Sequence, residues 1–348
     1  MSILDNTKIQ IKNTEEFELY YRHRAIRYGS DKIFFNLGFF LESNETNTFS
    51  EENIDKHIIN VIKSNLDREF FINDSAEPIP PYIKNISKFI EICKLYNKSI
   101  TILTGENSDS LFNLYKSMGV NVIFLPLFNF FSYSQFSIYS SFSKENTFEK
   151  RYLTLNRASK PTRHYLYNFL KDNDLLKFGE YSFVFKDIKS FEEDINKNDN
   201  PLHTASIIDK FGFNKKCFLN FVVESVNDDY FTFNNQKIIT NFASEKTNKA
   251  LLTPLPFVII GEPNALHSLK SYGIKTFSDY WDEGYDLEYD TKIRTDKAAN
   301  ILKTICYESD SVLREIYNDT ESIHKENTSL INSILDDNIR LLKEKINL

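Results

Sequence analysis

The chain has 348 residues, 41% hydrophobic and 26% charged, which is enough for two domains of ordinary size with packed cores. Its 9 glycines form neither a G-x-G-x-x-G nor a G-x-x-x-x-G-K-[ST] motif, which argues against Rossmann dehydrogenases, protein kinases and P-loop NTPases. The formal net charge of −7 argues against a protein that mainly coats nucleic acid, although it leaves room for a local basic cleft.

The cysteines and the apolar runs indicate the cellular compartment of the protein. Cys93, Cys217 and Cys306 lie far apart in apolar or helical stretches, so we predict buried thiols in a reducing cytoplasm, without a zinc site or disulfides. The N-terminus is polar and does not resemble a signal peptide. The run at 120–131 is shorter than the roughly 20 residues of a membrane span and is interrupted by a proline. We expect a cytoplasmic protein without a membrane span.

The first half of the chain predicts a parallel sheet. Residues 84–98 show helical spacing, with four apolar side chains on one face: Ile86, Phe89, Ile90 and Cys93. A short buried strand follows at 99–105, a second helix at 108–119 and another strand at 121–128. This alternation of strand, helix and strand is typical of a βαβ unit.

The second half follows a Ser-rich connection at 131–148 and repeats the strand-helix pattern. The predicted strands lie at 151–157, 217–225 and 256–261, and the predicted helices at 158–176, 245–252 and 263–273. A polar loop rich in Asn and Asp separates the strand at 217–225 from the next helix. From about residue 292 the chain is expected to be helical to its end, as a packed amphipathic helix or as a coil that binds a partner.

These elements predict an α/β protein made of two consecutive βα domains that face a cleft, at 1–145 and 146–348. In such sheets ligands bind beyond the carboxyl ends of the strands, next to helix N-termini. Residues that end a strand or begin a helix are therefore the candidates for function.

The segment FASEKTNKAL begins a helix with a charged pair, Glu245 and Lys246. One explanation is that Ser244 or Glu245 caps the helix. The first turn of a helix has unpaired N–H groups, and a hydroxyl or carboxylate oxygen can accept hydrogen bonds from them. Lys246 is unfavourable at the same end unless an anion is present, and a nucleotide diphosphate would supply one. Glu245 would then accept hydrogen bonds from ribose or sugar hydroxyls.

Two other strand ends carry polar residues. Glu224 follows the buried strand FLNFVV and either faces a ligand or simply emerges into solvent. In LTLNRASKPTRHYL, Asn156 and Arg157 end a strand, while Lys160 and Arg163 lie at the start of the following helix. These cations form either a solvated basic turn or a phosphate site, in which arginine offers a bidentate fork and lysine a point charge.

The segments FLNFVVES, SEKTNKALLTPLPFVIIGEPNALHSLKSYG and GIKTFSDYWDEGYD, in this order, resemble the donor-binding half of GT-B glycosyltransferases. The likeness is to the fucosyltransferase and exostosin-like groups and to related enzymes of phages and other viruses. LTLNRASKPTRHYLYNFL resembles the start of the same half in the viral enzymes. The likeness covers roughly residues 151 to 335, and the sequence departs from the pattern at Ser244, where Thr is usual, and in the long loop before it.

The resemblance implies that the second domain holds a nucleotide-sugar donor. Glu224, Glu245 and Lys246 would contact its sugar, ribose or phosphates, with Ser244 beside them. Asn156, Arg157, Lys160 and Arg163 would bind the donor, the arginines neutralising the diphosphate. No metal or other cofactor is implied, because cationic side chains take the place of a metal ion.

A transferase of this kind also needs a base that deprotonates the acceptor hydroxyl if it inverts the sugar. Glu42 and Glu106 each follow an apolar run in the first domain and are the candidate bases, with a structural role as the alternative. The acceptor would be a glycan, or a modified DNA base if the enzyme is encoded by a phage. The competing interpretation is a catalytically silent binding or structural protein that keeps a GT-B-like fold.

Overall fold

The structure is a computed structural model of the whole chain. It describes residues 26–28, 32–36, 59–60, 62–73, 83–105, 108–127, 148–156, 159–183, 216–224, 231–233, 236–238 and 243–346. The statements below concern these residues.

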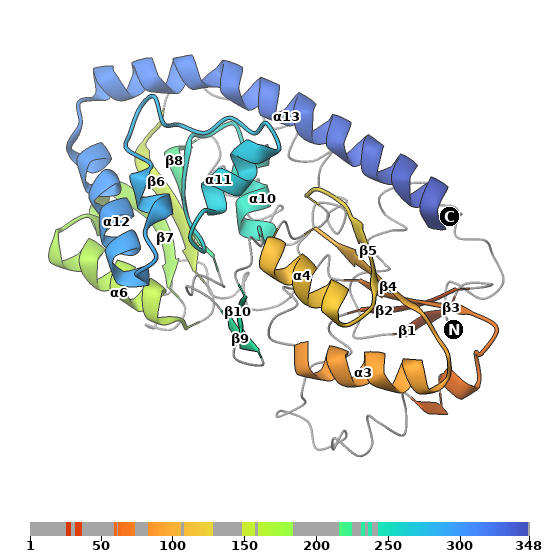
Figure 1. Cartoon of the computed structure of the whole chain (residues 1–348). Coiled ribbons are helices and arrows are strands. Elements are labelled where there is room, and N and C mark those ends of the chain that lie inside the picture. Colours follow the sequence, from red (N-terminus) through yellow and green to blue (C-terminus); the bar gives the residue numbers. More distant parts are fainter. Residues whose placement is uncertain are drawn as a thin grey trace. The chain divides into compact units, whose positions relative to one another are not determined.

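The chain divides into two compact units (Figure 1). The first unit comprises residues 1–132, 230–240 and 335–348, and the second comprises 133–229 and 241–334. The predicted boundary after residue 145 lies outside the described residues. Two short segments from the later part of the sequence therefore group with the first unit.

The first unit contains a five-stranded sheet in the order β1-β2-β3-β4-β5. The strands are β1 (Ile26–Tyr28), β2 (Lys32–Asn36), β3 (Glu69–Asn73), β4 (Ile100–Thr104) and β5 (Asn121–Phe124). β1 is antiparallel to β2 and every other pair is parallel, which confirms the parallel sheet predicted for this half. The helices α3 (Ile83–Leu95) and α4 (Asp109–Ser117) also lie where the apolar spacing predicts them.

The core of the first unit forms where those two helices bring their apolar faces to the sheet. All four residues of the predicted stripe on α3 are buried in one cluster with residues of β3, β4 and α4. Burial also raises the pKa of the Cys93 thiol to about 12. Cys217 and Cys306 are buried as free thiols too, so the prediction of buried thiols is confirmed.

A hairpin from the later sequence joins this core. β9 (Phe231–Phe233) and β10 (Gln236–Ile238) pair in antiparallel fashion, and Phe233 packs against the hydrophobic cluster of the first unit. The sequence predicted only a polar loop here, and that prediction is wrong for 231–233 and 236–238. The surrounding Asn and Asp residues obscure the short apolar alternation of Phe231 and Phe233 in β9, and β10 contains a single apolar residue, Ile238.

The second unit contains a four-stranded parallel sheet in the order β11-β8-β6-β7. Its strands are β6 (Lys150–Asn156), β7 (Gly179–Phe183), β8 (Cys217–Val223) and β11 (Phe257–Ile260). Its helices include α6 (Pro161–Asp172), α10 (Glu245–Leu252), α11 (Ala265–Ser271) and α12 (Thr291–Tyr307). Two 3-10 helices, η4 (Leu176–Phe178) and η6 (Gly284–Leu287), also belong to it. The α/β class with parallel sheets is therefore confirmed.

Helices cover both faces of this sheet. Tyr152 pairs with Leu219 and donates its hydroxyl to the carbonyl of Leu175, on the face where α12 also contacts α6. The next pair in register, Leu153 and Asn220, points to the opposite face because side chains alternate along a strand. There Asn220 donates to the hydroxyl of Thr253, just after α10. The helices α6 and α12 thus cover one face of the sheet, and α10 covers the other.

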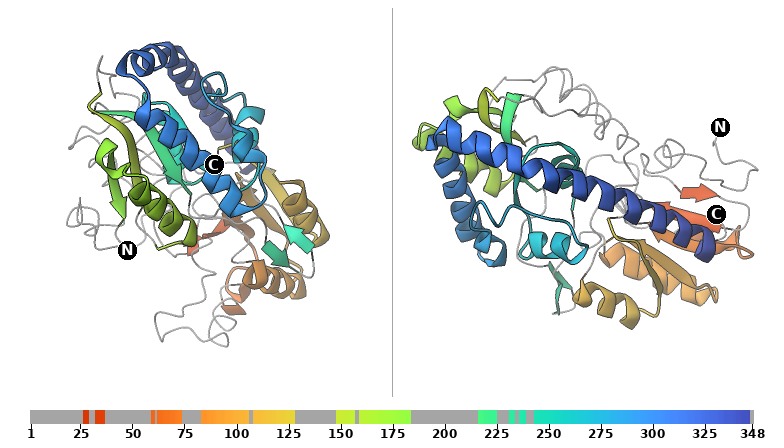
Figure 2. Two further views of the ribbon diagram at one scale, coloured as in Figure 1. Left: turned by 90° about the vertical axis from the view of Figure 1, so that its left-hand side faces the viewer. Right: turned by 90° about the horizontal axis from the view of Figure 1, so that it is seen from above.

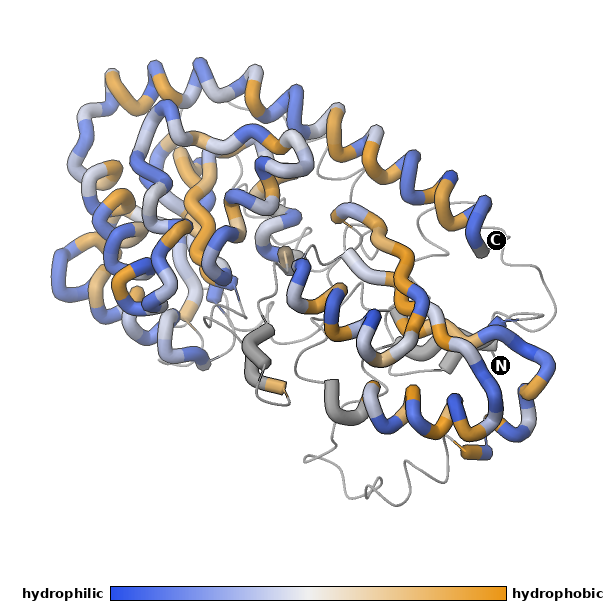
Figure 3. Tube along the Cα trace, in the orientation of Figure 1, coloured by the Kyte–Doolittle hydropathy of each residue, from blue (hydrophilic) through white to orange (hydrophobic). Residues whose placement is uncertain are grey.

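The helical C-terminus is confirmed, with a break at Glu308 between α12 and α13 (Asp310–Ile346). α13 is a single long helix (Figure 2), and apolar and polar residues alternate along it (Figure 3). Leu313, Tyr317 and Ile331 are buried, as expected for a packed helix rather than a free coil. No helix among the described residues is long and apolar enough to cross a membrane.

Candidate functional site

The carboxyl ends of the second unit's strands meet at one edge of the sheet. Asn156 at the end of β6 pairs with Phe183 of β7, and Val223 at the end of β8 pairs with Ile260 of β11. Glu224 directly follows β8. Two residues predicted from the sequence, Asn156 and Glu224, therefore lie on neighbouring strands at the edge where such sheets bind ligands.

Glu224 is 3% exposed, so it does not emerge into solvent. Its Oε1 accepts the N–H of Ser244 at 3.1 Å and both the N–H and the hydroxyl of Thr247, at 3.3 and 2.5 Å. Its Oε2 accepts the Ser244 hydroxyl. A carboxylate at a helix N-terminus stabilises the first turn through hydrogen bonds and through the helix dipole. Glu224 is therefore the cap that fixes the start of α10.

The predicted residues around the start of α10 divide into two groups. Ser244 is buried, and its Oγ also accepts the N–H of Lys246 at 3.2 Å, so it caps the helix as one of the sequence-based explanations proposed. Lys246 is partly buried in the first turn. Glu245 begins the helix, but its side chain lies outside the described residues.

Arg163 on α6 is 1% exposed, and its Nη2 donates to the carbonyl of Val223 at 3.0 Å. Val223 is the residue before Glu224, so the contacts Arg163–Val223 and Glu224–Ser244 link the starts of α6 and α10. The structure thus brings together three residues that the sequence predicted for one site from different segments.

The start of α6 is cationic. Its N-cap, Lys160, is exposed and makes no side-chain cap hydrogen bond, Pro161 occupies the first turn, and no acidic residue lies in that turn. Asn156 precedes it on β6, where its Nδ2 donates to the hydroxyl of Thr154 at 3.0 Å. Its Oδ1 has no hydrogen-bond partner among the described residues. Because Lys160 and the helix dipole meet no acidic residue in this turn, the N-terminus of α6 favours an anion.

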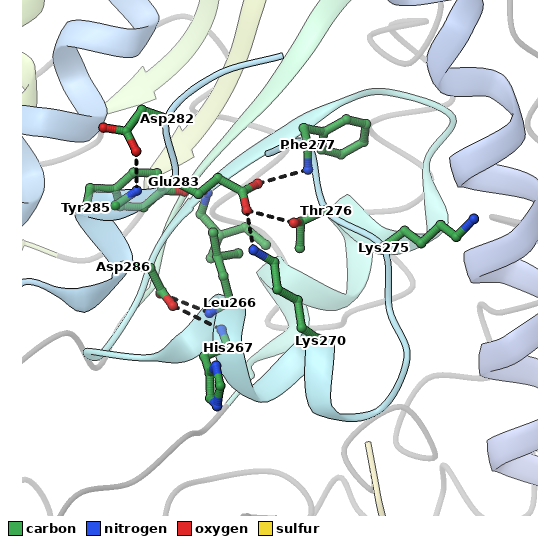
Figure 4. Close-up of polar contacts among 12 residues, drawn as sticks. Leu266, His267, Lys270, Lys275, Thr276, Phe277, Asp282, Glu283, Tyr285 and Asp286 are labelled. Atoms are coloured by element: carbon green, nitrogen blue, oxygen red, sulfur yellow. Dashed lines mark hydrogen bonds and ion pairs between the residues drawn. The ribbon is translucent and has the colours of Figure 1, made fainter. Parts of the chain in front are cut away.

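The start of α11 carries a buried carboxylate instead. Asp286 accepts the N–H groups of Leu266 and His267 at 2.9 and 3.0 Å (Figure 4). Close by, Glu283 accepts the N–H of Phe277 at 2.9 Å, and Lys270 lies 2.8 Å from its carboxylate. The segment GIKTFSDYWDEGYD therefore supplies caps and bridges that hold the fold around α11.

The remaining helices of this unit are capped as well. The Oδ1 of Asp290 accepts the N–H groups of Lys292 and Ile293 at 2.8 and 2.9 Å at the start of α12. The hydroxyl of Ser309 accepts the N–H of Val312 in the first turn of α13. Among the described α-helices of the second unit, α6 is thus the one that begins with cations and without a capping side chain.

Arg294 on α12 ties the end of β11 to the chain before α12. It is fully buried, and its Nε donates to the carbonyl of Gly261 at 3.0 Å. Its Nη1 donates to the carbonyls of Glu288 and Tyr289. A guanidinium is suited to this role because its five donors are held in a rigid plane. Arg294 therefore shapes the edge of the sheet beside Glu224.

Several predicted site residues cannot be placed. The candidate bases Glu42 and Glu106, and also Arg157, lie outside the described residues. Conversely, Thr247, Asp286 and Arg294 were not predicted from the sequence. Their partners lie about 20 or more residues away, at Glu224, Leu266 and Gly261, so no local spacing indicates them. Within the described ranges no group of three or more His, Cys, Asp or Glu residues could hold a metal ion.

Asp286 predicts a dependence of stability on pH. Burial raises the pKa of its carboxyl above the ordinary 3.8, and its hydrogen bonds from Leu266 and His267 offset part of that rise. The folded state therefore binds this proton more tightly than the unfolded chain, and the resulting stability is full below pH 3.8 and lost as the pH rises through the raised pKa. Urea unfolding should show that wild type exceeds Asp286→Asn in stability by more at pH 4 than at pH 7. A difference that grows with pH would contradict this.

Comparisons with known proteins found no matching family model, no matching curated protein and no matching solved structure. The function of the site therefore has to be inferred from the residues of this chain.

Proposed function

We propose that the chain is a glycosyltransferase that transfers a sugar from a nucleotide-sugar donor to an acceptor hydroxyl. One observation supports this most directly. At the carboxyl edge of a parallel sheet, α6 begins with Lys160 and Arg163, while the starts of α10 and α11 are capped by the carboxylates of Glu224 and Asp286. An anionic ligand would therefore bind at α6, and a diphosphate is the anion that links a nucleotide to a sugar.

In this proposal each placed residue has a role. Lys160 and the start of α6 stabilise the negative charge that develops on the departing diphosphate. Arg163, held at Val223, adds positive charge from within the fold. Glu224 acts as a positioning residue, because it fixes the start of α10 and thereby the place of Glu245 and Lys246.

The chemistry that these parts serve is the displacement of the diphosphate. The sugar passes through a transition state that resembles an oxocarbenium ion, in which charge has already moved to the leaving group. The cationic side chains neutralise that charge, so the proposal requires no metal ion. A base removes the proton of the acceptor hydroxyl, and Glu42 and Glu106 stay the candidates for it.

The finer parts of the proposal rest on the resemblance in sequence. They are a GT-B arrangement with the acceptor bound by the first domain, and a glycan or a modified DNA base as the acceptor. A silent binding protein is the second candidate. It draws support from Glu224, whose two carboxylate oxygens are both engaged inside the protein rather than offered to a ligand.

Hydrolysis of UDP-, GDP- and ADP-linked hexoses tests the proposal, because water can take the sugar in place of the acceptor hydroxyl while the nucleoside diphosphate is released. We expect wild type to release the diphosphate from at least one donor and Lys160→Glu to do so at least about tenfold more slowly. Lys160→Glu should fold well, because an acidic residue suits a helix N-terminus. Lys171→Glu, in the last turn of the same helix, is the matched control and should keep wild-type activity.

Three results decide between the candidates. Release by wild type that Lys160→Glu retains in full would contradict the placement of the diphosphate at α6. Binding of donors without release would favour the silent binding protein. Neither binding nor release by a folded wild-type protein would contradict both candidates.

A further inference from the structure

Asn248 is the fourth residue of α10 and is 2% exposed. Neither its Oδ1 nor its Nδ2 has a hydrogen-bond partner among the described residues. Its neighbour Thr247 is fully engaged with Glu224. Asn220, a buried asparagine of the same unit, donates its amide to Thr253. Asn248 thus differs from Thr247 and Asn220, because neither the oxygen nor the nitrogen of its amide forms a hydrogen bond.

An unpaired buried amide is costly, because water solvates both of its ends in the unfolded chain. Asparagine is also a poorer helix former than leucine, which has a similar size. The site would therefore be more stable with an apolar residue. Residues that lower the stability of the fold at their own position are expected at functional sites.

The position of Asn248 connects it to the anion site proposed at α6. Glu224 holds Thr247, the residue before Asn248, and the carbonyl of Val223, the residue before Glu224, receives Arg163 of α6. Thr247, the residue before Asn248, is therefore connected to the start of α6 through Glu224, Val223 and Arg163, although the amide of Asn248 itself takes no part in these contacts. A ligand bound at that edge by its phosphates would reach α10 with the groups attached to them.

We infer that Asn248 recognises a pair of neighbouring hydroxyl groups of the ligand. An amide offers an acceptor and a donor side by side, and adjacent hydroxyls on a ribose or a hexose can donate to one and accept from the other. This inference rests on the proposed function, since it assigns the hydroxyl-binding group of the same site. It makes Asn248 a specificity residue for a ligand with vicinal hydroxyls.

The test compares Asn248→Leu with wild type by thermal unfolding and by titration with pyrophosphate, UDP, GDP, ADP and the corresponding nucleotide sugars. Without ligand, Asn248→Leu should melt about 2–4 °C above wild type, because the unpaired amide is gone. Its affinity for pyrophosphate, which has no hydroxyl pair, should be unchanged. Its affinity for the ligand with the recognised hydroxyls should fall at least about tenfold.

The ligands distinguish the two sources of a hydroxyl pair. A loss of affinity for the nucleoside diphosphate indicates the ribose, and a loss only for the nucleotide sugar indicates the transferred sugar. Asn220→Leu is the control for a paired amide and should lower the melting temperature, because Thr253 loses its donor. If leucine does not fit in the space of Asn248, the ligand affinities of Asn248→Ala are compared with those of wild type instead.

Unchanged affinity of both Asn248 variants for a nucleotide sugar that wild type binds would overturn the inference and leave the proposed function standing. A fall in melting temperature with unchanged affinity would do the same and show that the amide is structural. If wild type binds none of the ligands, pyrophosphate included, the proposed function fails, and the inference fails with it.

Discussion

Arg294→Met is expected to destabilise the second unit by about 3 kcal/mol, because it removes the donors of several carbonyl groups at once. Gly261, Glu288 and Tyr289 all lose their hydrogen bond to the guanidinium, and the side chain that bridges them is fully buried. Methionine fills part of the space that Arg294 occupies but supplies none of its hydrogen-bond donors. Urea unfolding followed by the fluorescence of Trp281, the single tryptophan of the chain and a residue of the second unit, measures the change.

Lys292→Met is the matched control for Arg294→Met. Lys292 lies two residues away on the same helix, carries the same charge and is exposed. We expect no measurable change in the urea midpoint for this variant. Equal midpoints for Arg294→Met and wild type would contradict the role of Arg294 as the clamp between β11 and α12.

Glu224→Ala should also cost about 3 kcal/mol, because the first turn of α10 loses its cap. Two backbone N–H groups and two hydroxyls, from Ser244 and Thr247, would be left without their acceptor in a buried place. Glu224→Gln keeps one acceptor oxygen and should lose less, about 1 kcal/mol. The same urea titration followed by Trp281 fluorescence measures both variants.

The order of the two Glu224 variants is the decisive outcome. If Glu224→Ala is as stable as wild type, the carboxylate does not hold α10 and is available for a ligand, as the sequence alone suggested. Glu315→Ala, at an exposed position on α13, is the control for loss of an acidic residue and should leave the urea midpoint unchanged.

The regular elements could be predicted because their signals are local. The stripe on α3 and the apolar runs of β4, β8 and β11 are visible within a few residues, and the structure places an element at each. The strands β1, β2, β3 and β7 and the hairpin β9–β10 were missed. β1, β9 and β10 have three residues each, and β2 and β3 each carry only three consecutive apolar residues, so their hydrophobic pattern is too brief to stand out. In β7 the pattern is shortened by Gly179 and Glu180.

The sequence could indicate that residues of different segments lie together at the carboxyl edge, but it could not assign their contacts. Glu224 and Ser244 were expected near a donor, and the structure places them together at the carboxyl edge of the sheet. What the sequence could not reveal is that they bind each other, since 20 residues separate them. The same holds for Asp286 and α11, because a carboxylate that caps a distant helix leaves no spacing pattern.

The measurement that tests the central claim most directly is calorimetric titration of wild type and Lys160→Glu with UDP, GDP, ADP and pyrophosphate. The account predicts that wild type binds at least one nucleoside diphosphate and pyrophosphate, and that Lys160→Glu binds both at least about tenfold more weakly while remaining folded. Folded wild-type protein that binds none of these ligands would contradict the claim that the start of α6 is a diphosphate site.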